Sequence, residues 1–326
     1  MRNFLVAAVA GLMATACGLP FGIGLASTSQ LINGAADNLA SASGFEVKGK
    51  FTTGGHNYTF DLEYQKPDAA DMVVDQDAVH LELLQVGGKA YYKSKDILTN
   101  TVGTDPFGQA VARAVGDKWF TSQDATPIDT TQFTDSQKVK ANFLNTLGVS
   151  RKDNVSVNGT DTAELSTSDT IVNISESSPY HLVRVETKPG KTVSDVSNGD
   201  FEFINYGKSF GLTAPTDVWQ IDDPSTWPAY YSVNSISVSR CDDPCVISAV
   251  IANKGGTKTG STPSVLTFTL TSKADQSSLG TCKVTISPDI SHGTTTTKSC
   301  SISTPQWTAF SGTYLYDATV DNPAYD

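Results

Sequence analysis

The feature that most constrains this chain is a strict alternation of apolar and polar side chains between residues 45 and 65. Phe45, Val47 and Phe51 alternate with charged residues, and a Gly54-Gly55 pair then marks a turn. The second run places Tyr58, Phe60, Leu62 and Tyr64 on one face. Successive side chains of a strand point to opposite faces, so this pattern predicts a β-hairpin with one apolar and one wet face.

More strands are expected on both sides of two helical stretches. The expected strands are 72–75, 79–86, 89–93, 118–121, 154–157, 162–166, 170–174, 182–187 and 201–206. One helix is expected over 27–42, one from Asp105-Pro106 to Gly116, and one from Thr134 to Gly148, with Gln137 completing a capping box. The pattern predicts one long antiparallel sheet with helices set to one side.

The N-terminal residues predict export. Arg2 precedes an apolar run, and the segment Ala14-Thr15-Ala16-Cys17 resembles the lipobox of bacterial lipoproteins, which implies lipidation of Cys17. Two alternatives remain: cleavage that leaves Cys17 as a free thiol, and an uncleaved helix over 4–26, which Pro20 disfavours. The expected location is the outer face of the cytoplasmic membrane, in the cell envelope.

Composition narrows the partners. A net charge of −11 disfavours nucleic acid, because phosphate binding requires clustered Lys and Arg. The same charge disfavours broad adhesion to anionic lipid, so the membrane would be held through Cys17. No apolar run after Ala26 approaches the roughly 20 residues of a spanning helix, and the body is expected to be soluble.

Four of the five cysteines lie in the last third of the chain. In an exported segment four cysteines suggest two disulfides, for which three pairings exist. We favour Cys241–Cys245 and Cys282–Cys300, because the first closes a short loop and the second joins two strand-like segments. A zinc site is the alternative, but these spacings fit no common zinc motif.

Residues that could carry chemistry are few. Gly207-Lys208-Ser209-Phe210-Gly211 fits the G-x-S-x-G pattern of serine hydrolases, but the following Leu212–Pro215 cannot form the helix that this motif needs. The histidines, at positions 56, 80, 181 and 292, show no metal spacing. We therefore expect no enzyme activity, no metal and no cofactor.

The domain organisation follows from these elements. We expect a signal peptide over 1–16, an anchor and tether over 17–26, and a first domain over 27–214. A linker over 215–232, rich in proline and aromatic residues, leads to a second domain over 233–326. The second domain contains only strand-like segments, which predicts a seven-strand immunoglobulin-like β-sandwich. The fold class is thus α+β followed by all-β.

The order of motifs in residues 27–220 resembles that of LolA-like lipoproteins of the LppX/LprG type. The motifs are Gly-Gly-Lys-Ala-Tyr-Tyr (87–92), Gly-Asp-Lys-Trp-Phe (116–120), Val-Asn-Gly-Thr-Asp-Thr (157–162) and Asn-Tyr-Gly-Lys (205–208). The resemblance implies an unclosed β half-barrel, covered by helices, whose hydrophobic cavity holds acyl chains. By sequence position the expected lining residues are Phe45, Val47, Phe51, Tyr58, Phe60, Leu62, Tyr64, Leu81, Phe107, Val111, Phe143 and Leu147.

Three classes of function therefore compete. The resemblance implies a lipoprotein that binds or carries a lipid or lipoglycan across the envelope. The alternative is a surface scaffold that binds another envelope protein and has no lipid cargo, its apolar face being filled by its own side chains. A serine hydrolase acting through Ser209 is the third.

Overall fold

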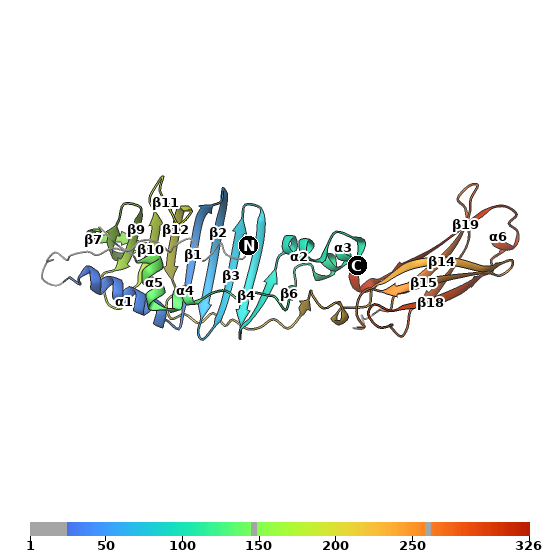
Figure 1. The fold of residues 1–326 in the computed structure, drawn as a ribbon, viewed down its shortest axis with the longest axis horizontal. Helices are drawn as coiled ribbons and strands as arrows, with labels where there is room; N and C mark the ends of the chain where they lie inside the picture. Colours follow the sequence, from blue (N-terminus) through green and yellow to red (C-terminus); the bar gives the residue numbers. More distant parts are fainter. Residues whose placement is uncertain (1–24, 145–148, 258–261) are drawn as a thin grey trace. The chain divides into compact units, whose positions relative to one another are not determined.

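The computed structural model describes residues 25–144, 149–257 and 262–326, and the chain divides into two compact units (Figure 1). The first unit ends at Thr216 and contains Ala125–Thr216 together with the described residues up to Ser94. The second contains Lys95–Asp124 and Asp217–Asp326. The expected boundary after residue 214 lies close to the observed one. However, Lys95–Asp124, which the sequence assigned to the first domain, groups with the second unit.

The first unit is built on one antiparallel sheet in the order β5-β4-β3-β2-β1-β12-β10-β9-β8-β7, with β11 paired to β12. The strands are β1 (Gly44–Thr53), β2 (His56–Gln65), β3 (Ala69–Gln76), β4 (Val79–Val86), β5 (Lys89–Lys93), β7 (Ser150–Val157), β8 (Thr160–Ser166), β9 (Thr170–Ser175), β10 (Leu182–Thr187), β11 (Thr192–Val193) and β12 (Val196–Ile204). Within the described residues β7 does not return to pair with β5, so the sheet is open, as the sequence predicted.

One face of this sheet is apolar and the other is polar, as the alternation predicts. Phe45 lies opposite Tyr64 and Val47 opposite Leu62, all four buried. On the other face Lys48 lies opposite Asp61, and the two form an ion pair of 2.8 Å. We call the face that carries Phe45 the inner face and the face that carries Lys48 the outer face.

Helices pack against the inner face. Helix α1 (Thr28–Ser41) begins with a complete capping box between Ser27 and Gln30, and it buries Leu31, Ala35 and Leu39. It contacts β9, β10 and the short helices α4 (Thr131–Thr134) and α5 (Ser136–Phe143). The apolar positions of these helices and of the inner face form one hydrophobic core.

The start of α5 differs from the prediction. The cap is Asp135, whose Oδ1 accepts hydrogen bonds from the amides of Gln137 and Lys138, and Thr134 instead ends α4. The expected end at Gly148 and the expected cavity residue Leu147 lie outside the described residues. Cys17 lies outside them as well.

The second unit begins with two helices, α2 (Lys95–Val102) and α3 (Pro106–Val115). Helix α3 starts as predicted: Asp105 caps it, Oδ1 accepting from the amide of Gly108, and proline occupies the first turn. Strand β6 (Trp119–Thr121) pairs in parallel with β13 (Val218–Gln220).

The rest of the second unit is two three-stranded antiparallel sheets, β14-β15-β18 and β17-β16-β19. The strands are β14 (Tyr231–Cys241), β15 (Cys245–Asn253), β16 (Val265–Ser272), β17 (Ser278–Thr285), β18 (Thr295–Ile302) and β19 (Tyr314–Asp321), with a one-turn helix α6 (Pro305–Thr308). Both predicted disulfides are present: Cys241–Cys245 joins β14 to β15, and Cys282–Cys300 joins the two sheets. The described residues form six strands here, where the immunoglobulin-like prediction expected seven.

The expected linker is packed within this unit. Trp227, in the turn after the 3₁₀ helix Pro224–Thr226, is 4% exposed, and its indole N–H donates to the carbonyl of Gln220 at 2.7 Å. Its ring lies 6.0 Å from that of Trp219. Trp227 is therefore buried within the second unit, and the half-buried Trp219 lies beside it.

Asn253, the last residue of β15, connects this strand to the segment of residues 215–232 through hydrogen bonds of its side chain. The buried amide accepts from the backbone N–H groups of Tyr230 and Gly255 at 3.1 Å, and donates to the carbonyls of Gly256 and Ile290 at 2.7 Å. All four hydrogen-bonding positions of the side chain are thus used.

No helix in residues 25–144, 149–257 or 262–326 is long and apolar enough to cross a membrane.

We predict that Asn253→Ala destabilises the second unit by about 3 kcal/mol, because it leaves several buried backbone groups without partners. The four tryptophans of the chain, Trp119, Trp219, Trp227 and Trp307, all belong to this unit. Tryptophan fluorescence during urea unfolding therefore measures the stability of the second unit. Asn234→Ala, at an exposed position of β14, is the matched control. Equal midpoints for the two variants would contradict the prediction.

Candidate ligand-binding face

The inner face of the first unit brings together most of the residues that the sequence singled out. The strand register gives four rows across β1 to β4, each with its side chains on the inner face. The rows are Phe45-Tyr64-Ala70-Gln85, Val47-Leu62-Met72-Leu83, Gly49-Phe60-Val74-Leu81 and Phe51-Tyr58-Gln76-Val79. All eight predicted strand residues lie in these rows.

Four aromatic side chains gather at one end of this face, and we call them the aromatic cluster: Phe51, Tyr58, Phe60 and Phe201. The Phe51 and Tyr58 rings stack at 5.0 Å, and Phe201 lies 5.9 Å from Phe60 and 6.1 Å from Phe51. Phe51 is 8% exposed, whereas Tyr58, Phe60 and Phe201 are only partly buried. This end of the face is apolar and incompletely covered.

Gly49 makes this arrangement possible. A Cβ at this position would lie 2.4 Å from a carbon of Phe60 and 2.7 Å from a carbon of Phe201. Non-bonded carbon atoms essentially never lie this close together. Glycine at position 49 therefore allows the two rings to pack across β1.

A second group of rings joins the helices to the other end of the face. Phe133 lies 5.9 Å from Phe45 and 5.6 Å from Phe143, and Phe143 lies 5.5 Å from Phe203 on β12. The predicted residue Phe143 thus contacts the inner face. Phe133, Phe201 and Phe203 were missed as candidates. The alternation Phe201-Glu202-Phe203 carried the signal for two of them, while Phe133 precedes the helical stripe and left none.

The structure places Phe107 and Val111 elsewhere. Both lie on α3, in the second unit, where the Phe107 ring is 4.8 Å from Tyr230, 5.8 Å from Trp227 and 6.5 Å from Tyr325. Val111 is fully buried there. The apolar stripe of α3 therefore packs within the second unit, and this replaces the expectation that it lines the first.

Across the outer face runs a row of carboxylates. Glu46 lies directly opposite Glu63, and Glu63 directly opposite Asp71. Like charges at directly opposed positions destabilise a sheet. Glu46 has two partners: it pairs with Lys48 at 2.6 Å and accepts a hydrogen bond from the side-chain amide of Asn205.

Burial and charge act together on this row. Burial raises the pKa of Asp71 to about 6, and Glu82, Glu63 and Asp61 add to the shift while Lys93 opposes it. Oδ1 of Asp71 is buried and finds no hydrogen-bond donor among the described residues.

The flanking carboxylates of the row shift in opposite directions. Burial, and then the charge of Glu46, raises the pKa of Glu63. For Glu46 burial acts upward, but the hydrogen bonds from Lys48 and Asn205 outweigh it and lower the pKa.

Ser209, the candidate nucleophile, has a structural environment. Its hydroxyl donates to Oε1 of Gln65 at 3.1 Å, and the amides of Phe210 and Gly211 donate to the same oxygen. An amide oxygen is not a general base at neutral pH, and the residues after Gly211 are not helical. The arrangement fastens this segment to the end of β2.

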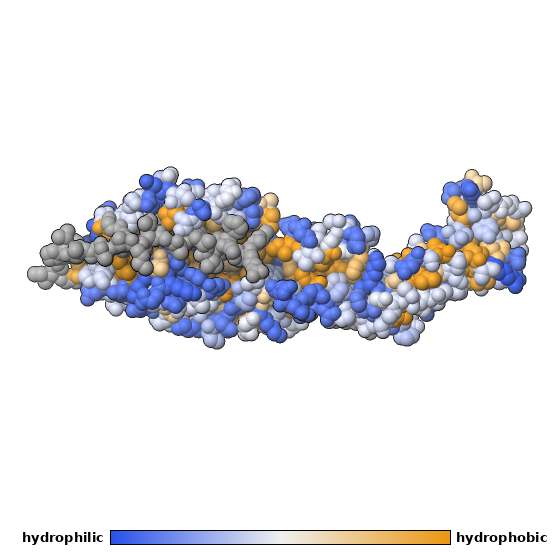
Figure 2. Space-filling model, in the orientation of Figure 1, coloured by the Kyte–Doolittle hydropathy of each residue, from blue (hydrophilic) through white to orange (hydrophobic). Residues whose placement is uncertain are grey.

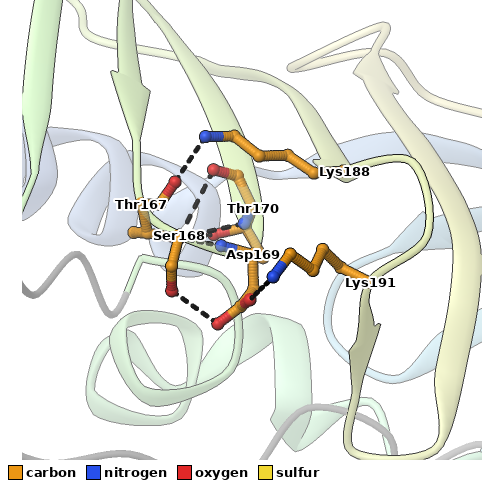
Figure 3. A network of polar contacts seen from close by, with 6 residues as sticks. All are labelled: Thr167, Ser168, Asp169, Thr170, Lys188 and Lys191. Carbon is orange, nitrogen blue, oxygen red and sulfur yellow. Dashed lines mark hydrogen bonds and ion pairs between the residues drawn. The ribbon is translucent and has the colours of Figure 1, made fainter.

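Other polar groups hold turns together. At the β8–β9 turn, the Thr167 hydroxyl accepts from the amides of Asp169 and Thr170, and Lys188 donates to the Thr167 carbonyl (Figure 3). Lys191 pairs with Asp169 at 3.7 Å. This network joins the β8–β9 turn to the segment between β10 and β11. Within the part of the chain that the structure describes, no group of three or more His, Cys, Asp or Glu side chains could hold a metal ion.

Comparison with known proteins adds little. No family model and no curated protein matches the chain. Among solved structures, MucB in complex with MucA(peri) is similar at 11% sequence identity, over 79% of this chain and 91% of that chain, with a TM-score of 0.31. A likeness at this level supports no conclusion about fold or function.

We predict that Asp71→Asn stabilises the first unit at pH 7 by about 2 kcal/mol and has little effect at pH 4. A carboxyl whose pKa is raised by folding binds its proton more tightly in the folded state. Its ionisation therefore costs stability, and the cost builds up as pH rises toward about 6. Thermal unfolding followed by far-UV circular dichroism measures it. Asp161→Asn, which removes the same charge from an exposed position of β8, is the matched control, and an equal gain at pH 7 in both variants would contradict the prediction.

Proposed function

We propose that this protein is an exported, lipid-anchored lipoprotein of LolA-like fold, whose first unit binds the acyl chains of a lipid or lipoglycan on the inner face of its sheet. The observation that carries the proposal is the aromatic cluster. Three of its four rings remain partly exposed although they belong to the apolar face. An acyl chain laid over them would remove this surface from water.

The binding energy would come from the hydrophobic effect. Transfer of a methylene group from water to an apolar site is favourable by about 0.8 kcal/mol. A bilayer offers its lipids the same gain, so the face can extract a chain only if its contacts nearly match those of the membrane. Binding and release of this kind require no catalytic group, and transfer would follow a gradient or a partner.

The anchor is proposed from the sequence. The lipobox-like segment ending in Cys17 supports an anchor that would hold the chain at the outer face of the cytoplasmic membrane, in the cell envelope. There a tethered first unit would meet lipid at high local concentration. The partners of the proposal are thus the membrane, the lipid ligand and a further envelope protein that receives it.

The first test is retention of lipid through purification. We predict that the wild-type protein carries lipid that native mass spectrometry and organic extraction detect. Phe60→Arg should reduce this lipid about tenfold, because a guanidinium in the aromatic cluster would have to lose its hydration beneath a hydrocarbon chain.

Thr59→Arg is the matched control. Thr59 is the neighbouring residue of β2 and lies on the outer face, where it donates to Asp75. The same charge is thus added to the same strand but on the opposite side. If the wild-type protein carries no lipid, or if both variants retain it equally, the proposal fails.

A second candidate function is a scaffold that binds another envelope protein. Leu315 and Tyr316 on β19 are each 43% exposed, and both belong to the second unit. Hydrophobic residues also gather over β14 and β15 on the face shown in Figure 2. Strand β19 lies at the edge of its sheet, and exposed apolar residues on an edge strand favour contact with another chain.

The lipid-binding function and the scaffold function predict loss of activity in different variants. If the protein is a scaffold, Leu315→Ser with Tyr316→Ser should abolish capture of an envelope partner by crosslinking, while Phe60→Arg leaves capture intact. Thr319→Ser, at an exposed position of the same strand, is the control. Unchanged capture in the double variant would remove this candidate.

A further inference from the structure

One buried polar group on the inner face has an unused acceptor. Gln85 lies on β4, directly between Ala70 of β3 and Ala90 of β5, and is only 5% exposed. Its Oε1 is buried and has no hydrogen-bond donor among the residues that the structure describes. Buried polar atoms are nearly always partnered in folded proteins, so an orphan of this kind points to a donor beyond the residues that the structure describes.

The orientation of the amide is fixed by its other end. Nε2 of Gln85 donates to the backbone carbonyl of Asp68 at 3.1 Å. A carbonyl oxygen can only accept, so the amide cannot be turned over without losing this bond. The oxygen, and not the nitrogen, is therefore the buried atom without a partner among the described residues.

Two tyrosine hydroxyl groups of the inner face are engaged elsewhere. The hydroxyl of Tyr64 donates to the carbonyl of Pro67 at 3.1 Å. The hydroxyl of Tyr92 donates to the carbonyl of Thr126 and accepts from its amide, both at 3.0 Å. Each of these hydroxyls has one proton, and in each case it is already given to a backbone oxygen.

The position of Gln85 relates it to the aromatic cluster. Gln85 belongs to the row of Phe45, and the cluster occupies the rows of Gly49 and Phe51, four and six residues along β1. At about 3.4 Å per residue these two rows lie about 14 and 20 Å from the row of Gln85 along the strands. A hydrocarbon chain laid along the strands over the cluster would therefore bring its polar end toward Gln85.

We infer that Oε1 of Gln85 accepts a hydrogen bond from a hydroxyl group of the bound lipid, so that the first unit selects hydroxyl-bearing acyl lipids. This inference rests on the proposed lipid-binding function. The amide oxygen can accept a hydrogen bond from a hydroxyl group, but its partial negative charge repels an anion. A lipid hydroxyl therefore fits this position, and an ionised carboxylate does not. A site that pairs a buried polar group discriminates against ligands that lack its partner, because the group is then left unsatisfied.

The test compares two probes that differ in the donor. 1-Decanoylglycerol carries free hydroxyls, and methyl decanoate has the same chain with no donor. Each is titrated against the full chain in competition with the apolar dye N-phenyl-1-naphthylamine. We expect wild-type protein to bind 1-decanoylglycerol about tenfold more tightly than methyl decanoate. Gln85→Leu should abolish this preference and keep the affinity for methyl decanoate.

Gln76→Leu is the matched control, because Gln76 lies on the same face, at the other end of the rows, and should keep the preference. Gln85→Met replaces the leucine variant if circular dichroism shows that the latter is unfolded, and the wild-type comparison needs no variant. Equal binding of both probes to wild-type protein, or a preference that survives in Gln85→Leu, overturns the inference and leaves lipid binding standing. If neither probe displaces the dye, lipid binding itself fails and the inference falls with it.

Discussion

The register of β1 with its neighbours β2 and β12 is the constraint on which the first unit depends. It places Phe45 beside Tyr64 and Val47 beside Phe203 on the inner face, while the charged residues of the same strands face outward. Because side chains alternate, a slip of one residue would exchange the two faces completely. Gly49 makes the register still stricter, because only its missing side chain leaves room for Phe60 and Phe201.

Both faces of the sheet carry features that reduce stability. The outer face opposes like charges and buries a carboxylate oxygen without a donor. The inner face leaves aromatic rings partly exposed and a glutamine oxygen unsatisfied. Natural chains tolerate local conflicts of this kind most often at functional sites. These local conflicts make the sheet of the first unit the better candidate for a functional site. The second unit is held by two disulfides, and its buried Asn253 uses all of its hydrogen-bonding positions.

Much of this could be predicted from the sequence. The alternation from Phe45 to Tyr64 gave the sheet and its two faces, because strand periodicity is local. Asp105 marked a helix start for the same reason, and the short loop between Cys241 and Cys245 favoured the observed pairing. What failed depended on distant neighbours. The stripe containing Phe107 showed that one side of α3 is apolar, but not that Trp227 and Tyr230, more than a hundred residues later, would cover it.

Other features of the site left no readable signal. Thr134 and Asp135 are both acceptable caps, and the choice between them depends on how the preceding turn, α4, packs. Gln85 occupies an inward position although it is polar, and only the strand register reveals this. The burial of Asp71 likewise comes from residues on other strands, so its raised pKa could not be derived from its own surroundings in the sequence.

The pairing of β1 with β12 also has a kinetic consequence. Strands β1 to β5 end at Lys93, yet the partner of Glu46 is Ile204, so the two halves of the sheet are joined only after roughly 110 more residues (204 − 93) have been made. At about 5–20 residues per second this delay is on the order of ten seconds. During that time the apolar inner face of β1 to β5 would be exposed to solvent. Such a nascent chain is a natural client for a holding chaperone until the second half arrives.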